Sequence, residues 1–195
     1  MSTLETERLL LRPASREDAS FFTSALADYD IARQLSSVPY PYTEEDADVF
    51  IETVTKARAM GEAWVFTVLS KATATPVGCV GLHIKDGRYE LGYWFAKPYW
   101  GRGFATEAAR RVLAFTFGVV RADAVQAGWF HDNIASGRVL AKLGFTATHV
   151  ESWPSRARGE RVLCNRTLLT RENFGRKKPP EAPPVRQSES TALAS

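Results

Sequence analysis

The sequence predicts a mixed α/β fold (α+β in its arrangement) with a twisted, mostly antiparallel sheet of about seven strands and about four flanking helices. Two observations predict this class. Three strand-like runs with alternating apolar residues follow one another between residues 63 and 96, and two strand–helix units come after them. Consecutive strands without a helix between them pair antiparallel, so a doubly wound parallel sheet is not expected.

The N-terminal segment predicts one strand and one helix. Residues 7–12 contain three consecutive leucines and predict the first strand, which Pro13 ends. Ser15 and Asp18 have the spacing of a capping box, with Asp where Glu or Gln is usual. The helix that they open keeps apolar residues in helical spacing as far as Tyr29.

A loop rich in proline and tyrosine, residues 38–42, separates this helix from a second one. The second helix begins after the capping pair Thr43 and Asp46 and ends at Gly61. An Asp-Gly pair between alternating apolar runs then predicts a β-hairpin within the central strands. These strands are expected at residues 63–70, 76–84 and 89–96.

The second half of the chain predicts two more helices and three more strands. The first of these helices spans about residues 103–118, and the second lies between Asn133 as its N-cap and Gly144 as its C-cap. The strands are expected at residues 124–130, 145–153 and 161–169, with a polar loop at 154–160.

One domain is therefore expected over residues 1–172, which is long enough to bury a substantial core. Residues 173–195 are rich in proline, serine and small residues and predict a disordered tail. Hydrophobic residues make up 45% of the chain and charged residues 24%, as in an ordinary globular protein.

Composition also excludes several classes of function. The net charge of +3 is too small to predict nucleic-acid binding, and part of it lies in the tail. No leader and no apolar run long enough to cross a membrane is visible, and no metal-ligand cluster appears. Cys79 and Cys164 follow no spacing pattern, so a cytoplasmic protein with reduced thiols is expected.

The most informative segment is residues 100–107, Trp-Gly-Arg-Gly-Phe-Ala-Thr-Glu, which follows the third central strand and opens a helix. Glycines at a helix N-terminus present backbone N–H groups and the positive end of the helix dipole to an anion. The segment does not fit a Walker loop, because no Gly-Lys-Ser/Thr follows. It does not fit the dinucleotide fingerprint either, since Thr106 stands where the third glycine would be.

The segment resembles the phosphate loop of the GNAT N-acetyltransferase superfamily, Gln/Arg-x-x-Gly-x-Gly/Ala, with Trp100 in place of the first residue. Further motifs are similar to the branch that contains the ribosomal-protein N-terminal alanine and serine acetyltransferases. The four motifs lie at residues 6–13, 90–94, 100–108 and 133–145. The resemblance covers about residues 3–172.

This resemblance implies that the chain is an acyltransferase with acetyl-CoA as the co-substrate, no metal, and a primary amine as the acceptor. It places the pyrophosphate on the loop and the pantetheine arm beside the strand around Gly92. The residues that would contact the coenzyme are Tyr93, Phe95, Trp100, Gly101, Arg102, Gly103, Phe104, Ala105, Thr106, Asn133, Ser136 and Lys142.

An amine attacks only in its neutral form, so a positioned base is worth about 10²–10⁴ in rate. The resemblance makes Glu90 the candidate catalytic base, directly or through a water, because related enzymes often carry a catalytic Glu on this strand and Glu90 lies two residues before Gly92. A backbone N–H between Tyr93 and Phe95 would stabilise the thioester oxygen. Many members of the superfamily place a tyrosine acid in the slot that Leu140 occupies here. Ser136, one turn earlier, is the candidate to hydrogen-bond the departing sulfur.

The acceptor is left open between a protein N-terminus and a small amine. The loops at 38–42 and 154–160 are expected to form its walls, and Arg156, Arg158 and Arg161 slightly favour an acceptor that carries anionic groups. A homodimer is possible. The alternative function is a non-catalytic coenzyme-A-binding module or sensor, since Leu140 cannot donate a proton.

Overall fold

The computed structural model describes residues 3–175. One sheet of eight strands has the order β1-β2-β3-β4-β5-β6-β8-β7, and every neighbouring pair is antiparallel except β5 and β6. The strands are β1 (Leu4–Glu5), β2 (Leu9–Pro13), β3 (Ala63–Ser70), β4 (Pro76–Lys85), β5 (Arg88–Phe95), β6 (Ala124–Phe130), β7 (Thr146–Ser155) and β8 (Glu160–Thr170). The helices are α1 (Ala19–Leu26), α2 (Tyr29–Ala32), α3 (Glu44–Ala59), α4 (Phe104–Phe115) and α5 (Ile134–Leu143).

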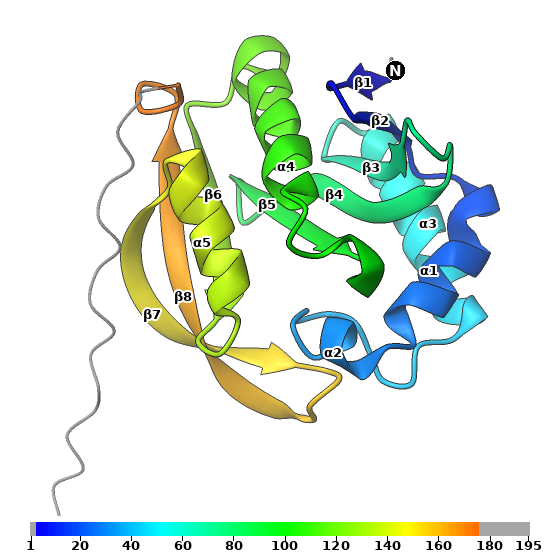
Figure 1. Ribbon diagram of the computed structural model, residues 1–195. Coiled ribbons are helices and arrows are strands. Elements are labelled where there is room, and N and C mark those ends of the chain that lie inside the picture. The colour runs from blue at the N-terminus through cyan, green and yellow to red at the C-terminus, as the bar shows by residue number, and fades with distance from the viewer. Residues whose placement is uncertain (1–2, 176–195) are drawn as a thin grey trace, which may run out of the picture.

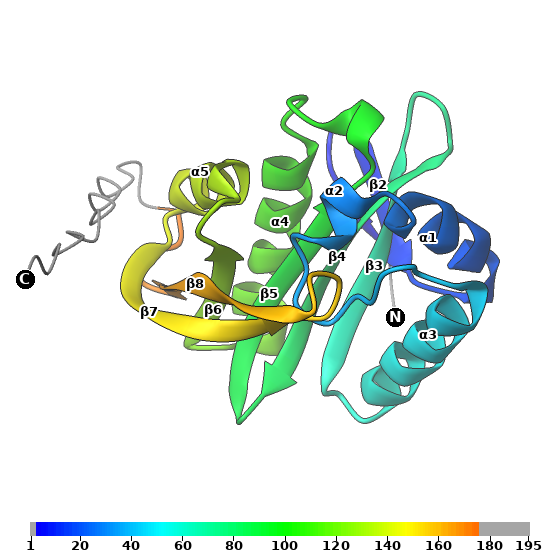
Figure 2. The ribbon, with the colours of Figure 1, turned by 90° about the horizontal axis from the view of Figure 1, so that it is seen from below.

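Helices cover both faces of the sheet (Figure 1, Figure 2). Alternation along the strands divides the buried side chains into two main cores. The first core packs the sheet against α4 and α5 and includes Leu91 and Phe95 of β5. The second packs α1 and α3 against Val65 and Cys79, with Trp94 of β5 at its border. Strand β5 therefore contributes to both cores, and its even-numbered side chains face the α1 side.

The expected mixed, mostly antiparallel sheet is confirmed, with one strand and one helix more than predicted. The first strand begins at Leu9, because Glu7 and Arg8 form a turn. Thr6 closes this turn: its N–H donates to the Leu9 carbonyl (3.0 Å) and its hydroxyl accepts the Leu9 N–H (2.9 Å). The turn sends the preceding residues back along β2 as the short strand β1.

The predicted first helix is interrupted. A 3-10 turn precedes α1, and Asp28 then starts the separate helix α2 by accepting the Asp30 N–H (2.9 Å). The capping pair before α3 is confirmed, since Thr43 and Asp46 bond reciprocally. The expected caps of α5 at Asn133 and Gly144 are also confirmed.

Two further boundaries differ from the prediction. The polar loop at 154–160 is shorter, because β7 and β8 stay paired to Ser155 and Glu160 and leave only residues 156–159 between them. Pro154 is tolerated because β7 is an edge strand. Helix α4 ends at Phe115 and continues as a π-helical turn to Val120.

The C-terminal end of the described chain packs onto the first core, where Phe174 contacts Phe117 (5.1 Å between ring centroids). Residues 176–195 of the predicted tail lie outside the described residues, so the division at residue 172 stays a prediction.

The sheet parts between β5 and β6. These parallel strands pair only at Tyr89 with Val125 and at Glu90 with Gln126, and beyond these residues they diverge. Within residues 3–175, the segment from Leu91 to Phe95 on β5 therefore has no strand paired with it on that edge. We call the space between the diverging strands the β5–β6 slot.

Candidate functional site

The glycine-bearing loop connects the end of β5 to α4, at one side of the slot. Gly101 and Gly103 have φ angles of +73° and +78°, a conformation that other residues rarely adopt. Among residues 3–175, no heavy atom other than those of Gly101 and its two chain neighbours lies within 4 Å of where a Cβ on Gly101 would stand. Within residues 3–175, the backbone N–H groups from Gly101 to Thr106 have no hydrogen-bond acceptor. An exposed row of free donors at a helix N-terminus fits a phosphate-bearing ligand.

The side chains of the loop turn away from this row. Trp100, which replaces the usual first residue of the motif, donates from its indole N–H to the Phe95 carbonyl (2.6 Å) and so ties the loop to the strand end. Phe104 is buried and stacks on Tyr99, and the Phe95 side chain belongs to the first core. For Phe95 and Phe104, only the backbone is left to contact a ligand.

Backbone N–H groups of β5 face the slot. Ala96 donates its N–H to Val77 of β4 (3.0 Å), whereas the Phe95 carbonyl points away from β4 to Trp100. Because alternate residues of an antiparallel strand turn their polar groups to opposite edges, Tyr93 and Phe95 direct their N–H groups away from β4. These are the donors that the sequence assigned to the thioester oxygen.

Two hydroxyl groups meet across the slot. The Tyr93 hydroxyl lies 2.9 Å from the Ser136 hydroxyl and 3.3 Å from the Ser136 carbonyl. Burial raises the pKa of Tyr93, against the smaller effect of its hydrogen bond with Ser136, so the phenol stays protonated at neutral pH. If Tyr93 donates to Ser136, the hydrogen of Ser136 is free for a ligand. Sequence reasoning chose both residues but missed their contact.

The neighbouring residues of α5 have different roles. Asn133 accepts the Ser136 N–H on its side-chain oxygen (3.1 Å), which fixes the first turn of the helix. Leu140 is completely buried in the first core. The Lys142 carbonyl accepts from Arg110 (3.3 Å), which is six residues along α4 from Phe104 and about 9 Å down its axis, so a contact of the Lys142 side chain with the coenzyme stays a prediction.

Glu90 lies on the opposite face of β5, on the α1 side, and forms an ion pair with a buried arginine. Its Oε1 accepts from Arg166 (2.8 Å), whose side chain is 6% exposed, and among residues 3–175 its Oε2 has no hydrogen-bond donor. Arg166 also contacts Glu151 (3.1 Å) and lies over the Trp153 ring (4.3 Å). Burial alone would lower the pKa of Arg166, but its bond with Glu90 raises it.

Sequence reasoning missed Arg166. The available signal was a charged residue on the strand face that also carries the apolar residues Val162, Cys164 and Leu168. Its two carboxylate partners give the cluster a net charge of about −1, which suits a cationic amine. His83 lies directly opposite Glu90 on β4, and burial lowers its pKa although Glu90 acts against this.

The comparisons with known proteins agree with this geometry. An acetyltransferase (GNAT) domain family matches residues 8–146, which is most of the chain. The chain belongs to the GNAT acetyltransferase family. It is therefore an enzyme of the acyltransferase class, and its fold is the GNAT fold.

Individual relatives are distant. An uncharacterized N-acetyltransferase, p20 of Bacillus licheniformis, is 28% identical over 90% of this chain and 100% of its own length. A GNAT-family acetyltransferase from Bacillus anthracis is structurally similar, with a TM-score of 0.76, 24% identity and coverage of 88% and 99% of the two chains. Mycobacterium smegmatis RimJ, solved in complex with CoA-disulfide, has a TM-score of 0.77 at 20% identity and covers 88% of each chain.

Helix α2 spans the open end of the slot in this GNAT domain (Figure 1). On one side Asp28 and Asp30 bind Lys97, which follows β5 (3.0 and 2.5 Å). On the other side Arg33 binds Asp132, which follows β6 (2.8 Å). Both edges of the slot are thus connected through one short segment.

The β7–β8 hairpin closes onto the same segment. Arg158 binds Asp132 with both terminal nitrogens (2.8 and 3.0 Å) and donates to the Arg33 carbonyl (2.8 Å). Arg156 donates to the carbonyl of Ser37, and Arg161 bonds within the hairpin. Arg156 and Arg158 thus connect the hairpin to other loops, and Arg161 is engaged within the hairpin, which weakens the argument that the three arginines select an anionic acceptor.

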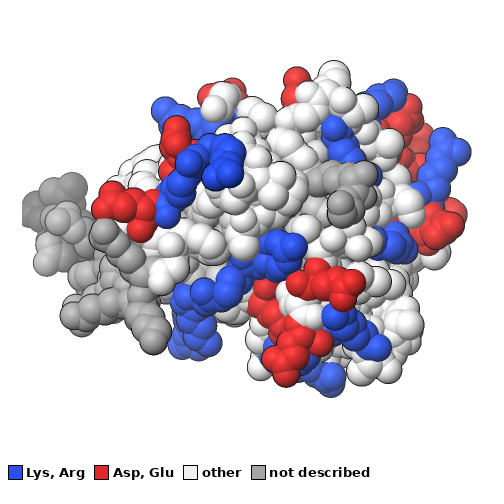
Figure 3. Space-filling view, turned by 90° about the horizontal axis from the view of Figure 1, so that it is seen from above, with Lys and Arg blue, Asp and Glu red and all other residues white. Residues whose placement is uncertain are grey.

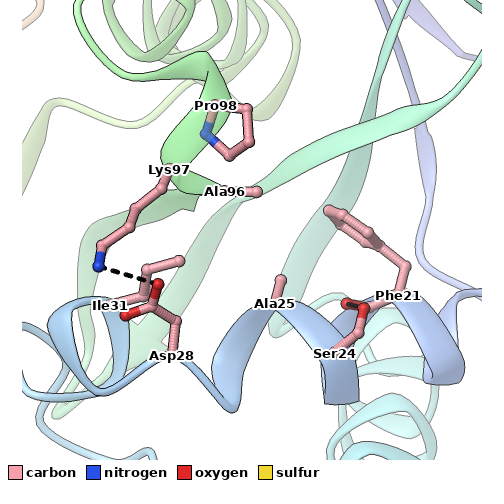
Figure 4. A pocket seen from close by; sticks show the side chains of 8 residues that line it. All are labelled: Phe21, Ser24, Ala25, Asp28, Ile31, Ala96, Lys97 and Pro98. Carbon is pink, nitrogen blue, oxygen red and sulfur yellow. Dashed lines mark hydrogen bonds and ion pairs between the residues drawn. The ribbon is translucent and has the colours of Figure 1, made fainter.

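Cavities near the site are small. One of about 210 Å³ lies between α1, α2 and the segment after β5, where the ion pair between Lys97 and Asp28 crosses it (Figure 4). Another, of about 470 Å³, lies at the hairpin tip, residues 154–161. On the face seen in Figure 3, basic and acidic side chains are interspersed.

No helix in residues 3–175 is long and apolar enough to span a membrane, and this part of the chain holds no metal-binding group of three or more His, Cys, Asp or Glu.

Proposed function

We propose that the protein transfers an acetyl group from acetyl-CoA to a primary amine, by direct attack of the amine in a ternary complex. The observation that carries the proposal is the row of backbone N–H groups from Gly101 to Thr106, beside the β5–β6 slot, for which the described part of the chain supplies no acceptor. Bound acetyl-CoA would supply the acetyl group as a reactive thioester. The loop N–H groups would bind its pyrophosphate, and the open space at Gly101 fits that ligand.

The catalytic groups divide between the two faces of β5. Glu90 would take the proton of the attacking amine on its free Oε2, directly or through a water, while Arg166 holds the other oxygen. The N–H groups of Tyr93 and Phe95 would stabilise the charge that develops on the thioester oxygen. Ser136, with Tyr93 behind it, would donate a hydrogen bond to the leaving sulfur. A thiol pKa of about 8.5 makes a strong acid at the Leu140 position unnecessary.

The acceptor is a protein N-terminus or a small amine. Structural similarity to RimJ and to a ribosomal-protein-S5-alanine acetyltransferase from Vibrio fischeri supports the first class, but these proteins are only 18–20% identical to this chain. The negative cluster of Glu90, Arg166 and Glu151 supports an acceptor that arrives as a cation. The cytoplasmic location and the homodimer expected from the sequence stay predictions.

Release of free thiol from acetyl-CoA, measured with a panel of amines and N-terminal peptides, tests the proposal. We expect Glu90→Gln to lower kcat by about 10²–10⁴ without changing coenzyme binding. Glu151→Gln is the matched control, because it removes the other carboxylate of Arg166 and leaves Glu90 in place. A loss of kcat confined to Glu151→Gln would reassign the base.

Ser136→Ala tests the leaving-group contact in the same assay, and a smaller decrease in kcat is expected. Tight coenzyme binding without turnover over the whole panel, and no effect of Glu90→Gln, would instead support the non-catalytic binding module.

A further inference from the structure

Arg8 reaches from the turn between β1 and β2 to the phosphate loop, about ninety residues later in the sequence. Its Nη1 donates to the Arg102 carbonyl (3.0 Å) and its guanidinium lies over the Phe104 ring (4.8 Å from the centroid). Its Nη2 lies 3.5 Å from the point where a Cβ on Gly103 would stand. Arg8 therefore contacts the loop from behind, on the carbonyl side.

Glu107, in the first turn of α4, holds Arg8 in this position. Its Oε2 accepts from Arg8 Nε (2.7 Å) and lies 2.6 Å from Nη2, and its Oε1 accepts the Arg8 N–H (3.0 Å) and the Thr6 hydroxyl. Desolvation would raise the pKa of Glu107, but the bonds from Thr6 and Arg8 lower it overall. The carboxylate is thus charged at neutral pH and paired at both oxygens, which makes this contact stronger than a simple surface ion pair.

The contact with the Arg102 carbonyl fixes the direction of a free donor. In a trans peptide the C=O and N–H bonds point in opposite directions, so the peptide that turns its carbonyl to Arg8 turns the Gly103 N–H away from it. Gly103, on one side of this peptide, has a positive φ, and glycine permits the peptide plane to rotate at little cost. A charged hydrogen bond to the carbonyl opposes that rotation and polarises the N–H.

We infer that Arg8, held by Glu107, is a positioning residue that keeps the loop N–H groups directed toward the pyrophosphate. The inference rests on the proposed function, since it assumes that the loop binds coenzyme A. It assigns a role to the N-terminal Thr6–Arg8 turn, which otherwise lies outside the site.

Calorimetric titration with coenzyme A tests the inference. Arg8→Met keeps an unbranched side chain over Phe104 but removes every side-chain hydrogen-bond donor. It is expected to raise the Kd about tenfold or more, while kcat at saturating acetyl-CoA stays unchanged. Arg8→Lys should restore part of the affinity. Glu107→Gln, which leaves Arg8 in place, should have an effect of the same direction and serves if Arg8→Met does not fold.

Lys71→Met is the matched control. Lys71 follows β3 and is a second cation bound to the N-terminal segment, where it contacts Glu5 and the Thr6 carbonyl (2.8 Å each), but no hydrogen bond or ion pair within residues 3–175 joins it to the loop. The Lys71→Met variant should bind coenzyme A with a Kd within about twofold of the wild-type value. A donor without pyrophosphate, acetyl-pantetheine, should be used equally well by the wild type and by Arg8→Met, which a general structural defect would not allow.

The inference would be overturned if Arg8→Met bound coenzyme A as tightly as the wild type, or if Lys71→Met lost as much affinity as Arg8→Met. It would also be overturned if the difference in Kd between Arg8→Met and the wild type disappeared at about 1 M salt, where long-range attraction is screened. If the wild type itself does not bind coenzyme A, the proposed function fails instead.

Discussion

The substitution Gly101→Ala allows an effect on coenzyme binding to be distinguished from an effect on the stability of the fold. In the free protein Gly101→Ala meets no heavy atom within 4 Å, so its cost is the positive φ of +73°, about 1–2 kcal/mol. For a chain of this size that corresponds to a decrease in Tm of about 2–8 °C. Gly61, after α3, has a φ of +74° and is equally open. Gly61→Ala therefore carries the same strain far from the loop.

The two variants should differ once coenzyme A is added. The methyl group stands beside the free N–H groups and keeps the phosphates at a distance, and losing one charged hydrogen bond costs about 1.5–3 kcal/mol, or about 10- to 150-fold in Kd. A ligand present at 100 times its Kd stabilises the wild type by about 2.7 kcal/mol. After a 100-fold loss of affinity, the same concentration stabilises Gly101→Ala by only about 0.4 kcal/mol.

Thermal unfolding with and without coenzyme A is the assay. We expect both variants to unfold at similar temperatures without ligand, and only Gly61→Ala to be stabilised as much as the wild type. Equal stabilisation of Gly101→Ala would show that the loop is not the phosphate site.

Two more predictions concern pH and the acceptor. The pKa of His83 is lowered in the folded protein and is about 6.5 in the unfolded chain, so the unfolded chain binds more protons and stability is lost as the pH falls below about 6.5. In urea unfolding, the difference in the free energy of unfolding between the wild type and His83→Gln should therefore shrink between about pH 7.5 and 5.5. A difference that stays constant over this range would contradict the prediction. Arg158→Ala should raise the acceptor KM several-fold and leave the coenzyme Kd unchanged, because Arg158 connects the hairpin to Asp132 and Arg33. Arg161→Ala, whose bonds stay within the hairpin, should do neither, and equal effects of the two would remove the role of the connection.

Local sequence signals predicted most of the fold. The capping pair at Thr43 and Asp46, the N-cap at Asn133 and the Asp-Gly hairpin are each decided by neighbouring residues, and all three are confirmed. The break at Asp28 was missed because the apolar spacing continues through it to Tyr29. Strand β1 was missed because two residues are too few for a periodic pattern.

The site was only partly predictable for a related reason. The loop and the hydroxyl of Ser136 come from short motifs, whereas the partners of Glu90 and Ser136 lie 76 and 43 residues away in the sequence. No local rule pairs Glu90 with Arg166 or Tyr93 with Ser136. These pairs follow from the strand order, in which β6 lies between β5 and β8, and from the divergence of β5 from β6.

The ion pairs of α2 give the slot a mechanical property. The closed end of the slot is fixed by two residue pairs of the sheet, whereas its open end is held by the exposed pair of Lys97 with Asp30 and the partly exposed pair of Arg33 with Asp132, each worth about 1 kcal/mol or less. Ion pairs this weak set the distance between the two strand ends, but they break at a small cost in free energy. We therefore expect the width of the slot at its open end to respond to ionic strength more than the paired strands that carry Glu90.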